Sequence, residues 1–130
     1  MEIRVYYEDT DAAGVVYHSN YLKYFERART EFLRERGLSV RDLAEQGWVF
    51  PVVKMQVEFR APALHDDLLE IETTLMSLGR TSFSLQQRVR RSADSKLLVE
   101  GIVTLACTGP HLKPRRLPAE LLAVLPEPAA

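Results

Sequence analysis

A short polar segment near the N-terminus holds the side chains best suited to chemistry. Between Glu8 and His18 the sequence carries three acidic residues, one glycine and one histidine, just ahead of a strongly periodic helical stretch. A carboxylate there, such as that of Asp11, can attack a carbonyl carbon or activate a water molecule. The unpaired N–H groups at the helix start, near residues 17–20, can hold the oxygen that becomes negative. This division of work suits the hydrolysis of an ester or a thioester.

The same segment admits three other interpretations. Asp9, Asp11 and Gly14 match positions 1, 3 and 6 of a calcium-binding EF-hand loop, but alanine and asparagine stand at positions 5 and 12. Alternatively, Asp9, Asp11 and His18 form a small ligand set for a divalent metal ion. In the third interpretation the two aspartates only cap the loop or the helix.

One long helix is predicted after this segment. Aromatic and small residues recur at steps of three and four and form one apolar face: Tyr17, Tyr21, Tyr24, Phe25, Ala28 and Phe32. Gly37 is a natural end for this helix. About nineteen residues at ~1.5 Å each give a rod of roughly 28 Å, which must pack on something large, most simply a sheet. Two tyrosines of this face, Tyr17 and Tyr21, are therefore expected in the core.

The rest of the chain is dominated by two-residue alternation of apolar and polar side chains. Strands are predicted over residues 3–7, 53–60, 69–75, 83–90 and 97–108. The short connections favour antiparallel neighbours. Two shorter helices are predicted, over Val40–Gln46 with Ser39 as N-cap, and near residues 119–124.

These elements predict an α+β fold in which one long helix packs on a five-stranded antiparallel sheet. The sheet's other face is expected to be polar to mixed. Residues 1–130 are expected to form a single domain, with a peripheral proline-rich tail from about residue 118.

Composition excludes several classes of protein. The chain has 130 residues, which suits one domain, and a formal net charge of −1, which excludes the basic field of a typical nucleic-acid-binding protein. The single cysteine, Cys107, excludes an internal disulfide and, in its apolar run, is expected to be buried. No signal peptide and no membrane-spanning stretch is recognised, so a cytoplasmic protein without membrane insertion is expected.

The polar segment also resembles a known family. Residues 8–18, followed by Asn20-Tyr21 and residues 26–29, are similar to the 4-hydroxybenzoyl-CoA thioesterase family of hotdog folds. The resemblance is to its acyl-CoA thioesterase branch, which is associated with the bacterial Tol-Pal system. It continues through residues 55–59 and 79–83, which mainly support the fold.

The resemblance implies roles for individual residues. The second aspartate of the family's Asp-x-Asp-x-x-Gly signature is the catalytic carboxylate, which corresponds to Asp11, as nucleophile or as general base. The backbone N–H of His18 would polarise the thioester carbonyl, and its imidazole is a further candidate for acid–base chemistry or substrate orientation. Gly14 would let the backbone approach closely, and Asp9 would support the loop.

The resemblance further implies a CoA ester as substrate, with no metal and no separate cofactor. Arg80 aligns with a basic turn that contacts the nucleotide in the family, and Arg60 and Tyr17 are further candidates for binding the substrate. The ratio of thirteen arginines to four lysines suits bidentate phosphate contacts.

The family implies a homodimer with sites at the subunit interface, often doubled into a homotetramer, and one helix covers too little of the sheet for a monomer. The acyl carrier is CoA or acyl carrier protein, and the acyl group is left open. Two rival functions remain: a non-catalytic acyl-CoA-binding protein of the same fold, and a hotdog dehydratase or hydratase.

Overall fold

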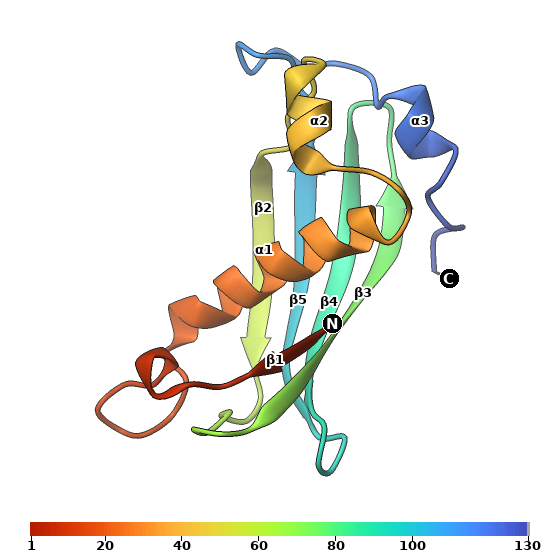
Figure 1. Cartoon of the computed structure of the whole chain (residues 1–130). Coiled ribbons are helices and arrows are strands. Elements are labelled where there is room, and N and C mark those ends of the chain that lie inside the picture. The colour runs from red at the N-terminus through yellow and green to blue at the C-terminus, as the bar shows by residue number, and fades with distance from the viewer. Residues whose placement is uncertain (130) are drawn as a thin grey trace.

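One long helix lies diagonally across one face of a five-stranded antiparallel sheet (Figure 1). The computed structural model describes residues 1–129. The strands are β1 (Glu2–Arg4), β2 (Val52–Phe59), β3 (Leu68–Leu78), β4 (Ser82–Arg91) and β5 (Leu97–Ala106), and the helices are α1 (His18–Arg34), α2 (Val40–Glu45) and α3 (Ala119–Leu122). The sheet order is β1-β3-β4-β5-β2, which leaves β1 and β2 at the edges. The predicted α+β architecture is confirmed.

The first strand is shorter than predicted. The sequence predicts residues 3–7, but β1 ends at Arg4, and a 3₁₀ turn occupies Tyr7–Asp9. The cause is Asp9, whose carboxylate accepts a hydrogen bond from the Tyr6 N–H (2.8 Å) while its own N–H donates to the Tyr6 carbonyl (3.0 Å). The chain therefore turns here and leaves the rings of Tyr6 and Tyr7 exposed.

The other predicted elements differ only at their ends. The strand predicted over residues 97–108 stops at Ala106, and the last helix stops at Leu122 rather than at residue 124. The Ser39 hydroxyl caps α2 as expected, because it accepts a hydrogen bond from the Asp42 N–H (3.2 Å).

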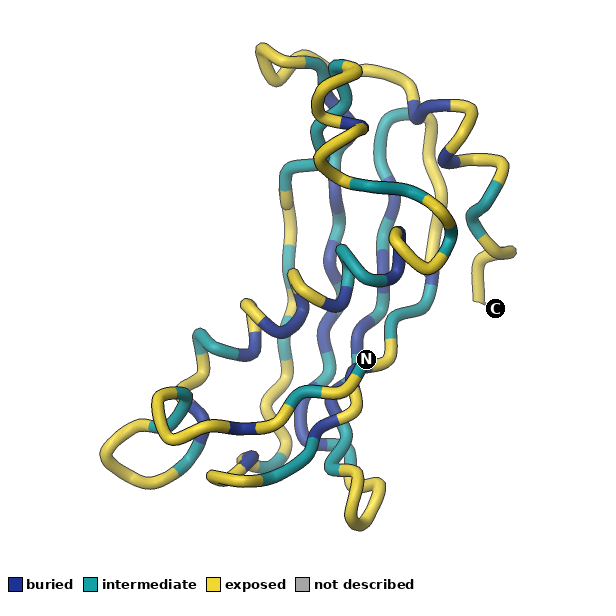
Figure 2. The backbone as a smooth tube through the Cα atoms, viewed as in Figure 1, coloured by how far each residue is buried: buried dark blue, intermediate teal, exposed yellow. Residues whose placement is uncertain are grey.

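The core forms two clusters along α1, and Figure 2 shows the buried positions on the facing sides of helix and sheet. Tyr24 and Phe25 belong to the first cluster, and Phe32 and Leu33 belong to the second. Burial of this apolar stripe is what holds the helix on the sheet.

One fully buried polar side chain, that of Gln87 on β4, lies between the two clusters. Leu85 on one side belongs to the second cluster and Val89 on the other side to the first. The Gln87 amide nitrogen donates to the Phe25 carbonyl (2.9 Å), and its oxygen accepts from the Arg29 guanidinium (3.2 Å). The buried amide is thus satisfied, and it ties the middle of α1 to the sheet.

The segment after β5 returns to the core. Leu117 and Leu121 are buried in the second cluster together with Cys107, and the Ala129 N–H donates to the Leu75 carbonyl (2.8 Å). The expected burial of Cys107 is confirmed, and this burial raises the pKa of its thiol. The domain limits predicted from the sequence, 1–130 with a peripheral tail, stay a prediction.

The sheet face opposite the helix carries an ionic row across four strands. Glu58, Glu100, Arg88 and Glu72 are successive cross-strand partners from β2 to β3. Arg88 pairs with Glu72 (3.6 Å) and with Glu100 (3.7 Å), and the predicted polar face is thereby confirmed.

Gly101 on β5 lets α1 approach the sheet closely. A Cβ atom at this position would lie 2.9 Å from Cε2 of the Phe25 ring.

We therefore expect Gly101→Val to lower the free energy of unfolding by about 2–3 kcal/mol, because the helix must move away from the sheet. Denaturant titration measures this change. Ala106→Val, on the same strand but facing away from the helix, is the control and should change it by less than about 0.5 kcal/mol. An equally small effect of Gly101→Val would contradict the expected clash.

Candidate active site

The segment between the 3₁₀ turn and α1 folds into a small closed loop. Thr10 and Val16 form an antiparallel bridge at its base. Nearer the tip, the Asp11 N–H donates to the Val15 carbonyl (2.9 Å), and the Gly14 N–H donates to the Asp11 carbonyl (3.0 Å). Gly14 has a φ of +79°, a conformation that favours glycine. Backbone bonds therefore fix where Asp11 lies, and the glycine is needed for the turn that follows it.

The two aspartates of this loop have different surroundings. The carboxylate of Asp9 caps the N–H of Tyr6 (2.8 Å). The exposed Asp11 accepts the Ala13 N–H through Oδ1 (2.8 Å), and its Oδ2 has no hydrogen bond from residues 1–129. Each carboxylate therefore caps the loop through one oxygen. Asp9 is half-buried whereas Asp11 is exposed, so the second oxygen of Asp11 combines a fixed orientation with access to a substrate.

The start of α1 provides unpaired N–H groups. Tyr17 is the N-cap residue, and no side chain caps the helix. The Asn20 N–H donates to the Tyr17 carbonyl (2.9 Å), but the N–H groups of His18 and Ser19 find no acceptor among the described residues. At the positive end of the helix dipole, these two groups can stabilise a developing oxyanion.

Aromatic rings surround the helix start. The rings of Tyr17 and His18 are 4.3 Å apart, and Phe59 at the end of β2 lies edge-on to His18 at 6.4 Å. Tyr21 is buried as predicted, and its hydroxyl accepts the Ala63 N–H (3.0 Å).

The prediction that Tyr17 belongs to the core is wrong, because its side chain is 45% exposed. Its backbone is extended at the N-cap position rather than helical, so the helical periodicity does not apply to it. This exposure keeps Tyr17 available as a substrate contact.

Phe59 was not singled out by the sequence as a site residue. It is 53% exposed although it lies against Tyr21. The only feature of the sequence that marks Phe59 is its place at the end of a strand in which apolar and polar residues alternate.

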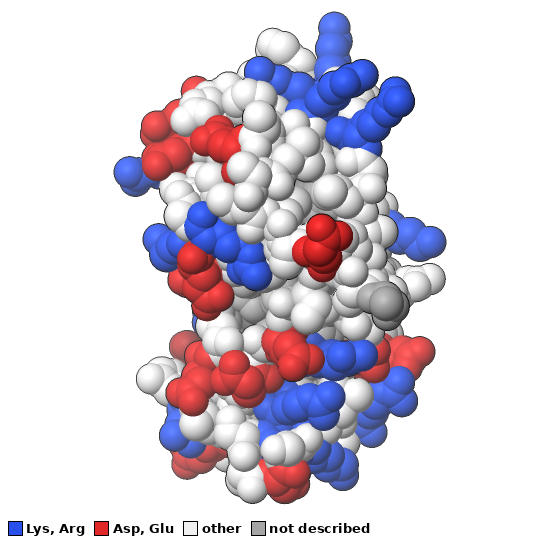
Figure 3. Space-filling model, turned by 90° about the vertical axis from the view of Figure 1, so that its right-hand side faces the viewer, with Lys and Arg blue, Asp and Glu red and all other residues white. Residues whose placement is uncertain are grey.

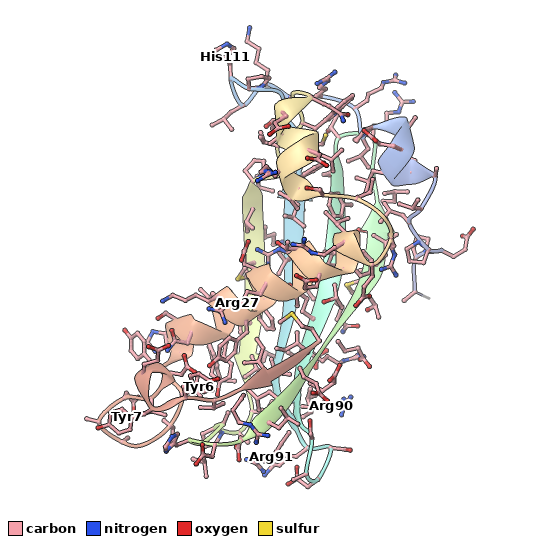
Figure 4. The ribbon with its side chains drawn as sticks, in the orientation of Figure 1. Tyr6, Tyr7, Arg27, Arg90, Arg91 and His111 are labelled. Carbon is pink, nitrogen blue, oxygen red and sulfur yellow. The ribbon has the colours of Figure 1, made fainter. Side chains whose placement is uncertain are left out.

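A buried hydroxyl group lies behind the loop. Tyr24 is 2% exposed, and its hydroxyl makes no hydrogen bond within residues 1–129. Burial raises the pKa of this phenol, and the nearby charge of Asp9 raises it further. Figure 4 places Tyr6 and Tyr7 at the same end of the molecule as the loop and His111 at the opposite end.

The two arginines predicted to bind the substrate lie far from each other. Arg60 follows β2, at the same end as Asp11, and pairs with Glu58 (2.7 Å) and Glu100 (3.5 Å). Arg80 is exposed in the β3–β4 turn at the opposite end of the sheet (Figure 1). Figure 3 shows lysine and arginine side chains gathered at that end. One chain alone therefore does not bring Arg80 and Asp11 together.

A cavity of about 130 Å³ lies under the second half of α1, beside α2. Its lining is mostly apolar: Glu26, Arg29, Thr30, Leu33, Val40, Phe50, Phe83, Leu85 and Leu105. Arg29 is held by Gln87, and burial lowers the pKa of its guanidinium. No local pattern in the sequence predicts this cavity, because its walls come from segments far apart in the chain.

Comparison with known proteins fits this architecture. Residues 5–125 match the model of a family described as the thioesterase-like superfamily. The chain belongs to this superfamily. The acyl-CoA thioester hydrolase YbgC of Escherichia coli O6:H1 is 48% identical over 122 residues, which cover 93% of this chain and 90% of that protein.

Further relatives agree. The acyl-CoA thioesterase YbgC of Haemophilus influenzae is 40% identical over 123 residues, which cover 93% of this chain and 89% of the relative. The solved structure of a 1,4-dihydroxy-2-naphthoyl-CoA thioesterase from Synechocystis has a TM-score of 0.90 and 26% identity, covering 96% of this chain and 93% of the other. The family and hotdog fold predicted from the motifs are confirmed.

Metal-binding interpretations of this thioesterase-like chain find little support in the geometry. Within residues 1–129, no three His, Cys, Asp or Glu side chains come together as a metal site. Asp9 and Asp11, two members of the predicted ligand set, instead accept backbone N–H groups. No helix in the described part of the chain is both long and apolar enough to cross a membrane.

Proposed function

We propose that this chain hydrolyses an acyl-CoA thioester to a free acid and CoA. The observation that carries the proposal is the unbonded carboxylate oxygen of Asp11, on a loop that leads directly into the unpaired N–H groups of His18 and Ser19. The relatives named as acyl-CoA thioesterases support this assignment.

In the proposed reaction, Asp11 acts on the thioester carbonyl carbon, either by direct attack to give a mixed anhydride or by deprotonating a water molecule. The carbonyl oxygen becomes negative and is held by the N–H groups of His18 and Ser19, each worth roughly 10²–10³ in rate by analogy with oxyanion holes. Gly14 shapes the turn, and the exposed rings of Tyr17 and His18 orient the substrate. CoA is part of the substrate, and no metal or further cofactor takes part.

We further propose that the working unit is a homodimer formed through β2. Within residues 1–129 this strand pairs only with β5, so its outer edge is open. The Asp11 loop and the start of α1 extend past this edge, beside the Phe59 end of the strand (Figure 1). A two-fold axis beside this open edge, between β2 and its copy, would pair the two strands and make one continuous sheet.

This dimer would complete the site. Antiparallel pairing sets the Phe59 end of one β2 beside the Val52 end of the other, where Val40 and Phe50 line the cavity. Each Asp11 loop would then face the partner's cavity, which takes the acyl group. CoA phosphates would be bound by exposed cations, among which Arg80 and Arg60 are the predicted ones. Acyl carrier protein as an alternative carrier, a homotetramer and a cytoplasmic location stay predictions.

A panel of acyl-CoAs with a thiol-reactive dye tests the function. Short, long and aromatic acyl groups should be compared, and release of free CoA is the expected result. The protein's own thiol should add little signal, because Cys107 is buried and its pKa is raised. Binding without thiol release would instead indicate a non-catalytic acyl-CoA-binding protein. Interconversion of enoyl and 3-hydroxyacyl thioesters would indicate a hydratase or dehydratase.

A further inference from the structure

The N–H groups at the start of α1 are unpaired because the N-cap residue, Tyr17, makes no side-chain hydrogen bond to them and no neighbouring side chain within the described residues takes its place. Aspartate and asparagine are preferred capping residues, and Asp9 and Asp11 lie in the loop before this helix while Asn20 lies in its first turn. The Asp9 carboxylate accepts from Tyr6, and the Asp11 carboxylate accepts from Ala13. The Asn20 side chain points to the loop instead of the helix end, and its Nδ2 donates to the Asp9 carbonyl (2.8 Å).

The Asp9 carbonyl is the point where loop and helix are joined. Besides the Asn20 side chain, it accepts the backbone N–H of Tyr17 (2.9 Å). Both bonds come from the helix start, and Asp9 lies two residues before Asp11. Asn20 is only half-buried, so burial of apolar surface does not explain its place here. The Asn20 side chain and the Tyr17 N–H therefore together set the distance between the Asp11 loop and the helix N–H groups.

We infer that Asn20 is a positioning residue for the hydrolysis assigned under the proposed function. Its carboxamide holds the Asp9 carbonyl across the helix start, so the loop keeps one orientation toward the N–H groups of His18 and Ser19. Asn20 does not touch the reacting atoms and acts through Asp9.

Two substitutions separate this role from a structural one. Asn20→Ala removes the bond to the Asp9 carbonyl and adds no charge. Asn20→Asp has nearly the same size, cannot donate to that carbonyl when ionised, and adds a negative charge in the first turn. That charge opposes a developing oxyanion, but it is favourable for the helix dipole. Activity should therefore fall further in Asn20→Asp than in Asn20→Ala, whereas stability should be no lower in Asn20→Asp than in Asn20→Ala.

The experiment measures kcat, KM and the thermal midpoint for both variants with the best acyl-CoA of the panel. We expect kcat to fall about tenfold for Asn20→Ala and about a hundredfold for Asn20→Asp, with KM within about threefold of wild type. The thermal midpoint of Asn20→Asp should equal or exceed that of Asn20→Ala. Ser39→Asp, which adds the same charge at the N-cap of α2, is the matched control and should leave kcat unchanged.

Two results would overturn the inference. One is a kcat within twofold of wild type in both variants, and the other is activity that simply follows the thermal midpoint. Hydrogen exchange gives a readout without turnover: the Tyr17 amide, bonded to the Asp9 carbonyl in the wild type, should exchange faster in Asn20→Ala while core amides do not. Unchanged exchange also counts against the inference. If the wild type releases no CoA, the proposed function fails while the exchange experiment still tests the role of Asn20.

Discussion

Asp11→Asn is expected to lower kcat for acyl-CoA hydrolysis by at least about a thousandfold, with the fold unchanged. A neutral carboxamide is neither a nucleophile for the thioester carbon nor a base for water. The carboxamide oxygen can still accept the Ala13 N–H that Oδ1 of Asp11 accepts now, so the loop keeps its turn. Because Asp11 is exposed, the free energy of unfolding should change by less than about 0.5 kcal/mol.

Steady-state CoA release and denaturant titration on the same preparation measure both parts of this expectation. Asp66→Asn is the matched control, since it makes the same chemical change at an exposed loop residue. Asp66 has a φ of +69°, which asparagine tolerates, so wild-type activity is expected there. Near-wild-type turnover in Asp11→Asn would remove the catalytic assignment, whatever the control shows.

The fold was predictable from the sequence because it depends on periodicity. The steps of three and four in α1 and the alternation in β2 to β5 describe burial directly. Tyr17 shows where this reasoning ends: it stands one residue before the helix, so its ring turns to the solvent. Gln87 occupies an apolar register yet is polar, and its partners Phe25 and Arg29 lie about sixty residues away in the chain. No local pattern reveals them.

The site was predictable only in part. The order of charged and small residues, with the family resemblance, pointed to Asp11 and to the start of α1. Both carboxylates cap one backbone N–H, of Tyr6 and of Ala13, and what separates them is that Asp9 is half-buried and Asp11 exposed. That difference depends on how the loop folds, which spacing alone does not determine. The cavity depends on long-range packing of Phe50 against Phe83, whose rings are 5.9 Å apart. These contacts exist only after the sheet has formed.

The separation of the loop and the cavity within one chain has a consequence for mixtures of variants. If each site takes Asp11 from one protomer and the cavity from the other, two defects in different chains can complement each other. Val40→Trp should fill the rim of the cavity, because Val40 is 39% exposed and lines it. We expect it to reduce CoA release below about a tenth of wild type without touching the Asp11 loop.

Mixing Asp11→Asn with Val40→Trp should therefore restore activity to about a quarter of the wild-type value. Random pairing makes half of the dimers mixed, and in each mixed dimer one of the two sites combines an intact Asp11 with an intact cavity. Mixing Asp11→Asn with a chain that carries both substitutions is the control and should restore nothing. Native mass spectrometry confirms that mixed dimers have formed. If they form and activity stays at the level of the separate variants, the site lies within one chain. The extension of the Asp11 loop past the edge of β2 would then not bring Asp11 to the partner's cavity.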